Sequence, residues 1–408
     1  MKSFIVAVSG LLATTGLFAQ NQFDRAKEVQ LNTITTAVPF LGITPDSKAG
    51  AMGDAGVSTL PDVNSIHWNS AKLAFLEDDM GVGFSYSPWL RAIVPDMSLS
   101  YLSFFKKINT NSTLGASLRY FSLGSITFTD DAGNNIRDFK PSEFAVDVAY
   151  ALKLSKRVST GVALRYVNSN LTGGTIVQGA ATKAGNSVAF DASVFYRSNK
   201  FKLAGKDAYV NLGANISNVG NKMNYSTSTT PDFIPTTLRF GPSLQIDVDE
   251  FNTFTFTADV SKLLVPTPPV YQLDSVGRKI YDADGNPLIS KGKDPNVSPA
   301  QGILQSFNDA PGGGKEELHE FNYSFGAEYL YNKQIAVRTG YFYEHPTKGN
   351  RQYITLGAGL KYQVLNIDLA YLIPTTQVNP LSNTLRITIR FTLSKSKEEA
   401  VNQDKIDG

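Results

Sequence analysis

The chain has 408 residues, no cysteine and a formal net charge of +2. Charged residues make up 18% of it, below the usual quarter of a soluble domain, whereas aromatic residues make up 11%. The lack of cysteine excludes thiol catalysis, Cys-based metal sites and disulfides, and the near-neutral charge gives no electrostatic case for a nucleic-acid partner. Beyond the N-terminus, no stretch has the roughly 18 consecutive apolar residues of a membrane helix. A helical membrane protein is therefore excluded, and a soluble fold and a closed β-barrel remain.

The N-terminus predicts export. Lys2 supplies a short positive region, and residues 4–18 form an apolar run that is too short to span a bilayer and then stop. The run ends at Ala19, and a polar stretch follows from Gln20. We therefore expect a signal peptide over residues 1–19. No Cys follows the cleavage site, which excludes a lipoprotein.

The next segment, residues 20–78, is rich in Gly and Pro and shows little period-two pattern. From about residue 80 onward, apolar residues alternate with small or polar ones, which is the period of a strand with two unlike faces. In residues 385–393, for example, Leu, Ile and Phe alternate with Arg and Thr. About fourteen such runs occur, and single-chain bacterial barrels have even strand numbers. The predicted strands are 80–88, 96–107, 111–123, 142–154, 158–171, 186–198, 207–218, 236–248, 252–264, 320–332, 334–344, 351–363, 364–373 and 383–394.

The connections between these runs alternate in length. Tight connections lie at 106–110, 155–157, 249–251 and near Lys333 and Val364, and 199–206 is the longest of this set. Most of those between them are longer, at 125–141, 172–185, 219–235 and 265–319, although two near Pro346 and Pro380 are short. Short periplasmic turns that alternate with long outer loops are typical of outer-membrane barrels.

The predicted fold class is therefore all-β. We expect a transmembrane antiparallel β-barrel of about 14 strands in the outer membrane, formed by residues 79–394. Residues 265–319 are expected to be a long extracellular loop that contains a small hairpin around residues 284–286. Residues 395–408 are charged and lack aromatic residues, and we expect them to be a flexible tail.

Two motifs precede the strands, a Gly-rich segment at residues 50–57 and the segment 64–71. This arrangement resembles the FadL-like barrel superfamily, in which the N-terminal segment folds back as a plug. The resemblance implies a plug over residues 20–78. The plug residues it singles out are Gly50, Met52, Gly53, Asp54, Gly56, Trp68 and Asn69.

Three further segments, residues 38–50, 88–90 and 371–374, resemble one branch of this superfamily. That branch is the PorV family, also called LptO, of the Bacteroidetes type IX secretion system. The resemblance implies a non-enzymatic subunit without a cofactor. Its partners would be the translocon barrel, cargo proteins through their C-terminal signal domains, a surface attachment complex with a sortase-like protease, and outer-membrane lipid and lipopolysaccharide.

Several charged residues fall on the strand faces opposite the aromatic side chains: Asp147, Arg165, Asp191, Asp259, Glu328, Arg386 and Arg390. A basic side chain that points at lipid near the midplane costs about 2–4 kcal/mol, so this face must line the lumen. We expect these charges to pair with one another and with plug residues such as Lys48 and Asp54. A polar conduction path is the alternative, but no ring of a single sign is present.

The first outer loop presents apolar residues between two prolines. Exposed apolar patches mark interaction sites, and Trp and Arg are common anchors. The predicted partner-binding residues are Pro88, Trp89, Leu90, Arg91, Ile93 and Val94. The alternative is that Trp89 belongs to the aromatic belt at the membrane interface. Residues 265–319 are a second candidate surface.

No catalytic constellation stands out. The three histidines, His67, His319 and His345, are expected to have structural or solvated roles, and no metal site is predicted. Residues 282–286 are similar to a calcium loop but lack its later Glu, so a β-turn is the preferred interpretation. Two other functions remain open. One is a transporter of hydrophobic small molecules with the plug as a ligand-gated hatch, and the other is a structural barrel that supports lipopolysaccharide modification by a separate enzyme.

Overall fold

The computed structural model describes residues 31–90, 94–129, 132–177, 180–226, 230–376 and 384–394. The predicted signal peptide at 1–19 and the predicted tail at 395–408 lie outside these residues. Among the helices in the described part of the chain, none has the length and apolar character needed to cross a bilayer.

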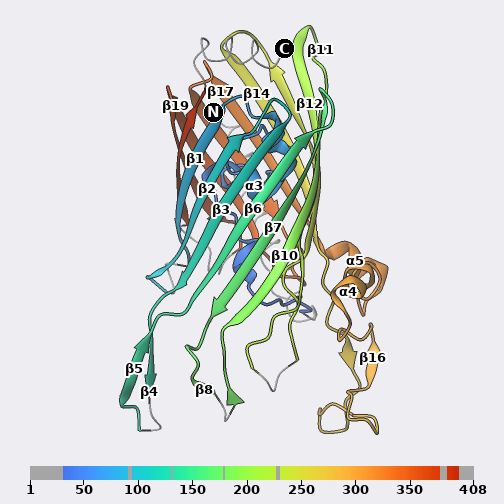
Figure 1. Ribbon diagram of the computed structural model, residues 1–408. Coiled ribbons are helices and arrows are strands. Elements are labelled where there is room, and N and C mark those ends of the chain that lie inside the picture. The colour runs from blue at the N-terminus through green and yellow to red at the C-terminus, as the bar shows by residue number, and fades with distance from the viewer. Residues whose placement is uncertain are drawn as a thin grey trace, which may run out of the picture.

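The described residues form a closed antiparallel barrel of fourteen strands (Figure 1). Each strand pairs with the next one in the barrel, β10 pairs with β12, and β1 pairs with β21 to close the sheet. Every strand begins and ends within two residues of the predicted span, so the predicted barrel is confirmed. The strands are β1 (Met80–Pro88), β2 (Met97–Lys107), β3 (Ser112–Leu123), β6 (Ser142–Lys153), β7 (Val158–Asn170), β10 (Gly185–Arg197), β12 (Lys206–Gly220), β13 (Thr237–Asp247), β14 (Asn252–Leu263), β17 (Phe321–Tyr331), β18 (Ile335–Tyr343), β19 (Gln352–Tyr362), β20 (Leu365–Pro374) and β21 (Leu385–Leu393).

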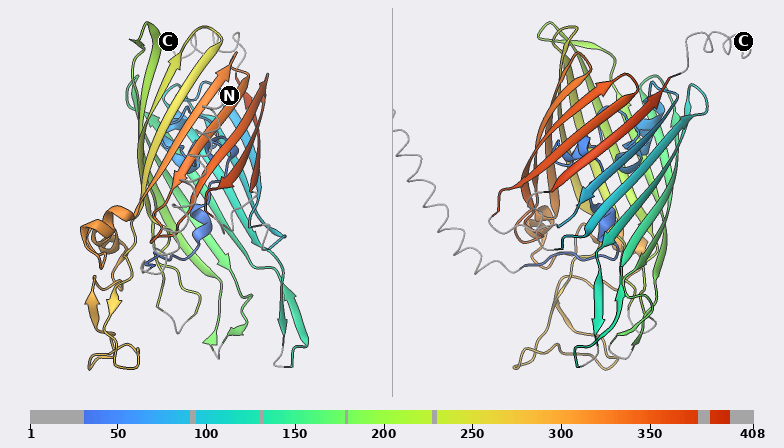
Figure 2. Two further views of the ribbon diagram at one scale, coloured as in Figure 1. Left: turned by 180° about the vertical axis from the view of Figure 1, so that it is seen from behind. Right: turned by 90° about the vertical axis from the view of Figure 1, so that its left-hand side faces the viewer.

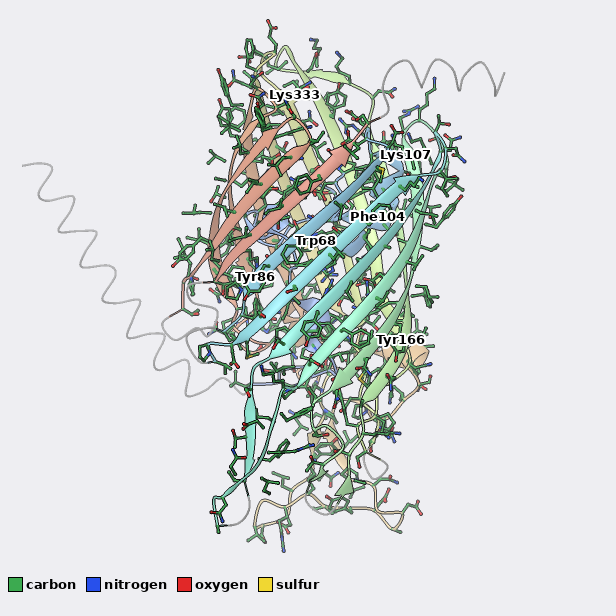
Figure 3. All side chains as sticks on the ribbon, turned by 60° about the vertical axis from the view of Figure 1, so that its left-hand side comes forward. Trp68, Tyr86, Phe104, Lys107, Tyr166 and Lys333 are labelled. Carbon is green, nitrogen blue, oxygen red and sulfur yellow. The ribbon has the colours of Figure 1, made fainter. Side chains whose placement is uncertain are left out.

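The outer face of the barrel is apolar along its strands. Val148, Leu164 and Phe190 are directly opposite one another on β6, β7 and β10, and all three are half or more exposed. Figure 3 shows Tyr86, Phe104 and Tyr166 on the same outer surface. Closure pairs the backbone of every strand within the sheet, which is the condition for crossing hydrocarbon with strands.

The two ends of the barrel differ. The tight turns lie at one end, where Lys107 and Lys333 are found and where the short strand β11 (Phe201–Leu203) extends one turn. The longer connections lie at the other end and carry their own structure (Figure 1). They contain β4 (Ile126–Thr129), β5 (Asn135–Phe139), β8 (Ile176–Val177), β9 (Ala180–Ala181), β15 (Val270–Tyr271), β16 (Ile289–Lys291), α4 (Pro299–Gln305) and α5 (Gly314–His319). By barrel convention the tight end is periplasmic and the other end is outside.

The long outer loop has the predicted small hairpin. Tyr281 bridges to Pro287, and β15 pairs with β16. The Asp282 carboxylate accepts the backbone N–H groups of Asp284 and Asn286, at 3.0 and 2.8 Å. This carboxylate therefore caps the turn, as expected for an Asx turn.

Most of the segment before the barrel, residues 31–76, lies inside the barrel (Figures 1 and 2), and its first residues reach the outer rim, where Asn32 donates its N–H to the Thr347 carbonyl oxygen. We call it the luminal segment. It consists of four short helices that the barrel wall surrounds: η1 (Pro39–Gly42), α2 (Ser47–Gly50), α3 (Ser65–Trp68) and η2 (Ser70–Phe75). Helices of four to six residues are not stable alone in water, so the contacts with the barrel determine their conformation.

Candidate functional site

Glycines on the inner face of the barrel bring the luminal segment against the wall. At each of seven inward positions, an added Cβ would lie within 3.0 Å of a luminal-segment atom. An ideal Cβ at Gly340 would lie 2.1 Å from the backbone nitrogen of Gly53. An ideal Cβ at Gly213 would lie 2.2 Å from the carbonyl oxygen of Val57. The backbones of the segment and the wall are therefore in direct contact. We call these positions the glycine belt: Gly83, Gly115, Gly161, Gly213, Gly326, Gly340 and Gly357.

Barrel side chains also hydrogen-bond the backbone of the luminal segment. The Asp259 carboxylate accepts the N–H groups of Gly56 and Val57 at 2.7 and 2.8 Å. The hydroxyl groups of Thr355 and Thr388 accept the N–H groups of Gly53 and Ser47, both at 2.9 Å. Bonds of this kind satisfy backbone groups that the short helices leave unpaired. The segment is thus fixed to β14, β19 and β21.

The predicted plug residues contact both the barrel wall and other residues of the luminal segment. The Asp54 carboxylate lies 3.1 Å from the Arg386 guanidinium, and a Cβ at Gly50 would meet the same side chain. Trp68 donates its indole N–H to Asp46 at 2.7 Å and covers Gly56. Asn69 donates to the carbonyl oxygens of Val57 and Val194, both at 3.0 Å. Met52 is buried against Gly326 and Gly340.

Five of the seven predicted lumen-facing charges belong to two buried groups, whereas Asp259 and Arg386 contact the luminal segment. In the first, Arg165 on β7 bridges Asp147 on β6 and Asp191 on β10. In the second, Arg338 pairs with Glu328 and Asp368, and Arg390 pairs with Asp368 at the next strand. Both groups mix signs and lie at the inner face of the barrel.

Arg390 also links the second group to the luminal segment. Its guanidinium lies 3.3 Å from Asp62, and Asp62 in turn pairs with Lys48 at 3.1 Å. The structure therefore brings together charges that the sequence placed only on one face of isolated strands. These pairs join strands of the wall, link the wall to the luminal segment, and connect two residues within the segment.

Sequence analysis missed several members of this interior. Arg338 and Asp368 complete the second charged group, and period-two alternation already placed both on the polar face. Arg119 on β3 is buried; it donates to the carbonyl oxygen of Leu41 at 2.7 Å and lies 2.6 Å from Nδ1 of His67. No local sequence signal links Arg119 with His67, because the contact spans 52 positions.

Cavities lie on both sides of the luminal segment. An outer cavity of about 420 Å³ is lined by Thr36, Trp68 and Arg239 among others. A periplasmic cavity of about 850 Å³ is lined by Lys48, Leu60 and other residues. The two cavities share no lining residue. The luminal segment therefore lies between two chambers of the lumen.

The predicted partner-binding patch is less exposed than its sequence suggests. Trp89 and Leu90 are half-buried, because both pack against Phe342, Tyr353 and Leu372 at the outer mouth of the barrel. Pro88 ends β1 and Val94 is also half-buried, whereas Arg91 and Ile93 lie outside the described residues. Trp89 therefore lies at the start of the first outer loop, and its side chain packs over the outer mouth of the lumen.

The base of the long outer loop is held by a buried charged cluster at the outer rim. Lys262, at the end of β14, pairs with Glu317 and Glu320 of the α5 region. Lys348, in the β18–β19 loop, pairs with Glu320 and with Glu316. The loop is therefore anchored to the end of β14 and to the β18–β19 loop.

Two of the histidines meet beside this cluster. The rings of His319 and His345 stack with centroids 3.5 Å apart and 8° between their planes. Partial burial, then the nearby Lys315 and Lys348, lowers the pKa of His319, and burial with His319 and Lys348 lowers that of His345. No group of three or more metal-ligating side chains occurs in the described part of the chain.

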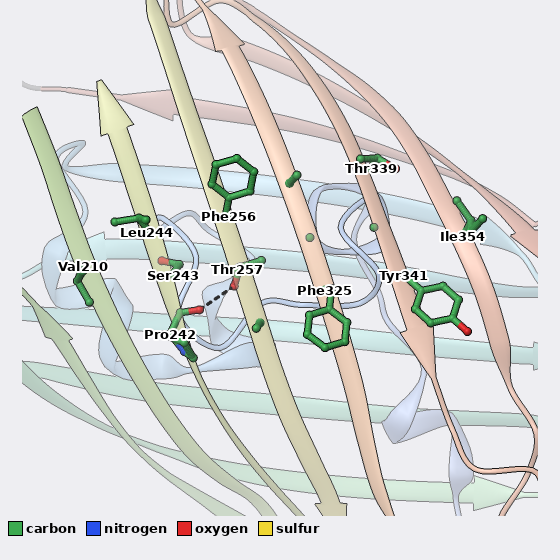
Figure 4. A pocket seen from close by; sticks show the side chains of 14 residues that line it. Val210, Pro242, Ser243, Leu244, Phe256, Thr257, Phe325, Thr339, Tyr341 and Ile354 are labelled. Atoms are coloured by element: carbon green, nitrogen blue, oxygen red, sulfur yellow. Dashed lines mark hydrogen bonds between the residues drawn. The ribbon is translucent and has the colours of Figure 1, made fainter. Parts of the chain in front are cut away.

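The outer wall carries an apolar groove of about 850 Å³ across β13, β14, β17, β18 and β19 (Figure 4). Small outward residues, among them Pro242, Ala258 and Ala327, form its floor, and Phe256, Phe325, Tyr341 and Ile354 stand at its sides. The β13–β14 ladder has no pairs at Gly241 and Pro242, where proline lacks an N–H. The Thr257 hydroxyl instead donates to the Pro242 carbonyl at 3.3 Å.

A family model described as type IX secretion system protein PorV matches residues 25–270, more than half of the chain. The chain belongs to the PorV family. The PorV family consists of non-enzymatic outer-membrane proteins of the type IX secretion system, which confirms the predicted family and location. None of the curated proteins matches the chain.

Solved structures of similar fold are outer-membrane channels. The toluene transporter TbuX of Ralstonia pickettii has a TM-score of 0.47 at 11% identity, covering 85% of this chain and 98% of that one. The toluene transporter TodX of Pseudomonas putida has a TM-score of 0.46 at 11% identity, covering 85% and 98%. A Pseudomonas aeruginosa FadL homologue has a TM-score of 0.42 at 11% identity, covering 89% and 99%.

Proposed function

We propose that this PorV-family barrel is a docking and shuttle subunit of the type IX secretion system. It binds the translocon barrel and the C-terminal signal domains of cargo, and delivers cargo to the surface attachment complex with its sortase-like protease. The match to the PorV family carries this proposal.

The luminal segment supports a docking role over conduction. It is fixed by the glycine belt, by Asp259 and by the ion pairs of Asp54 and Asp62. In a barrel whose lumen is filled in this way, the outer loops are the surfaces that remain available for binding partners. The first outer loop around Trp89 and the loop 265–319 are therefore the proposed partner-binding surfaces.

The test is secretion and partner recovery in the native host. Cells that lack the gene should retain cargo in the periplasm, and a tagged chain purified from detergent-solubilised outer membrane should bring down a very large barrel and cargo C-terminal domains. Recovery of the tagged chain alone, with normal cargo secretion in the deletion strain, would contradict the proposal.

The proposed surface is tested by replacing Trp89 and Leu90 with Ser. We expect lower recovery of partners while the barrel still assembles in the outer membrane. The matched control is Phe201→Ser, which removes an exposed apolar side chain at the opposite, tight-turn end. Equal partner recovery from both variants would remove the first outer loop from the proposal.

Transport of hydrophobic small molecules is the second candidate, because of the groove on the lipid-facing wall. Binding of a radiolabelled fatty acid to the purified chain, abolished by Ala327→Phe in the groove floor, would favour this function. Absence of binding would leave the docking role as the proposal.

A further inference from the structure

The two helices of the long outer loop lie beside the barrel. In Figure 1 they project past the wall near the outer ends of the strands, and the view from behind in Figure 2 shows the same displacement. The loop that carries them joins β14 to β17, so they lie at the outer rim next to the lipid-facing wall. In an outer-membrane barrel, this position is the boundary between hydrocarbon and headgroups.

The first of these helices, α4, has an exposed apolar side that faces away from the barrel wall. Its opposite side packs inward, since a Cβ at Gly302 would meet Phe233 and Pro266. Ala300 and Leu304 are one turn apart on the outward side. Phe307 lies just beyond the end of α4, with its ring 5.8 Å from the Lys262 ammonium. Leu304 is 75% exposed and Phe307 is 47% exposed. Such a stripe on a helix in water is unfavourable.

The second helix also exposes an apolar side chain and is held firmly. Leu318 of α5 is 65% exposed. The preceding residue is Glu317, whose carboxylate accepts the N–H groups of Asp309 and Ala310, at 2.7 and 2.8 Å, and pairs with Lys262. The Ser298 hydroxyl caps α4 by accepting the N–H of Gln301. The exposed apolar side chains are therefore presented by an anchored structure.

We infer that α4 and α5 form a foot that rests on the outer leaflet, with Leu304 and Leu318 inserted among the lipids. The stripe continues the apolar outer wall, where Phe325 on the adjoining strand β17 is half exposed. A helix with one apolar side at a membrane boundary lies in the interface with that side buried. The occupant of this surface is lipid, and the foot holds the barrel at a fixed depth and tilt.

The experiment uses single-cysteine variants, because the chain contains no cysteine and each new thiol is unique. Leu304→Cys is labelled with the fluorophore NBD, and the full-length barrel is placed in phosphatidylcholine nanodiscs that carry doxyl-labelled lipid. Phe325→Cys on the wall serves as the lipid-exposed reference. Val276→Cys, 72% exposed in the hairpin of the same loop, serves as the water-exposed reference.

We expect the label at residue 304 to be blue-shifted and quenched by doxyl lipid several-fold more than the label at 276, close to the value at 325. Ala300→Cys, on the same stripe, repeats the measurement if Leu304→Cys fails to fold. Quenching at 304 or 300 equal to that at 276 would overturn the inference. Since no partner protein is present in the nanodiscs, burial against a protein cannot produce the expected signal.

Discussion

The buried charged residues of the barrel strands lie on the inner face and so avoid contact with lipid. An Arg side chain that points at lipid near the midplane costs about 2–4 kcal/mol. Arg165 instead bridges carboxylates on its two neighbouring strands, and Arg338 on β18 bridges Glu328 on β17 and Asp368 on β20. Removing one member of such a group leaves an uncompensated buried charge, which is strongly destabilising. These residues therefore stabilise one register of the sheet as well as the filled lumen.

The closest wall contact of the luminal segment is at Gly340. In Gly340→Val, the new side chain has no space, because the Gly53 nitrogen is 2.1 Å from the ideal Cβ position. We expect the luminal segment to be displaced and the outer membrane to admit large hydrophilic antibiotics such as vancomycin, measured as increased sensitivity. Gly42→Ala, within the luminal segment but with open space around it, is the control and should leave sensitivity unchanged. Equal sensitivity of the two variants would contradict the direct contact.

Asp259 provides the strongest polar anchor of the segment. Asp259→Ala leaves the buried N–H groups of Gly56 and Val57 without their acceptor. Hydrogen bonds to a charged group contribute about 1.5–3 kcal/mol each, so we expect the free energy of unfolding to fall by at least this amount. Urea unfolding in detergent measures the change, and Thr253→Ala on the same strand is the control. A loss below about 0.5 kcal/mol would show that this anchor is dispensable.

Secondary-structure elements in this protein depend on one another. The luminal helices have four to six residues, and barrel side chains accept backbone N–H groups both from a helix, at Ser47, and from a turn, at Gly53. The outer helices α4 and α5 depend in the same way on the buried cluster of Lys262, Glu317 and Glu320. The local sequence of each of these helices is not enough to stabilise it, because nucleation of a short helix is unfavourable.

The contact between α5 and the β18–β19 loop should depend on pH. Folding lowers the pKa of His319 and His345, so the folded state binds protons more weakly and stability falls as pH decreases below 6.5. Asp309 acts in the opposite direction, because burial raises its pKa to about 6 and its protonation below that pH favours the folded state. We therefore expect loosening to begin between pH 7 and 6.

Hydrogen exchange of residues 315–320 and 345–350 measures this loosening, after correction for the intrinsic effect of pH on exchange. His345→Phe keeps an aromatic ring in the stack but removes one titrating group, so its pH response should be smaller. Exchange that is independent of pH in the unmodified chain would rule out the stacked pair as its cause.

At the scale of the whole molecule, closure of the barrel leaves its entire outer face in contact with lipid. Leu164 is 61% exposed near the middle of β7. Leu164→Arg should cost about 2–4 kcal/mol of stability in a bilayer, measured by urea-dependent folding into vesicles. Ile136→Arg, 65% exposed in the β4–β5 hairpin outside the membrane, should cost close to nothing. Equal effects of the two substitutions would contradict the assignment of the lipid-facing wall.

The sequence alone determined the strands, their faces and the alternation of short and long connections. Leu385 to Leu393 shows why: a strand with lipid on one side and polar contacts on the other must alternate at every residue. Local sequence also marked Asp147, Arg165 and Arg390 as inward charges.

Only the tertiary structure decided which of these groups meet. Arg119 and His67 are 52 positions apart, and Asp54 and Arg386 are 332 positions apart. The packing of Trp89 onto Phe342 and Tyr353 could not be predicted either, since the exposure of Trp89 depends on which side chains other strands of the barrel place there. Alternation is a property of one strand, whereas pairing depends on how all fourteen strands close around the luminal segment.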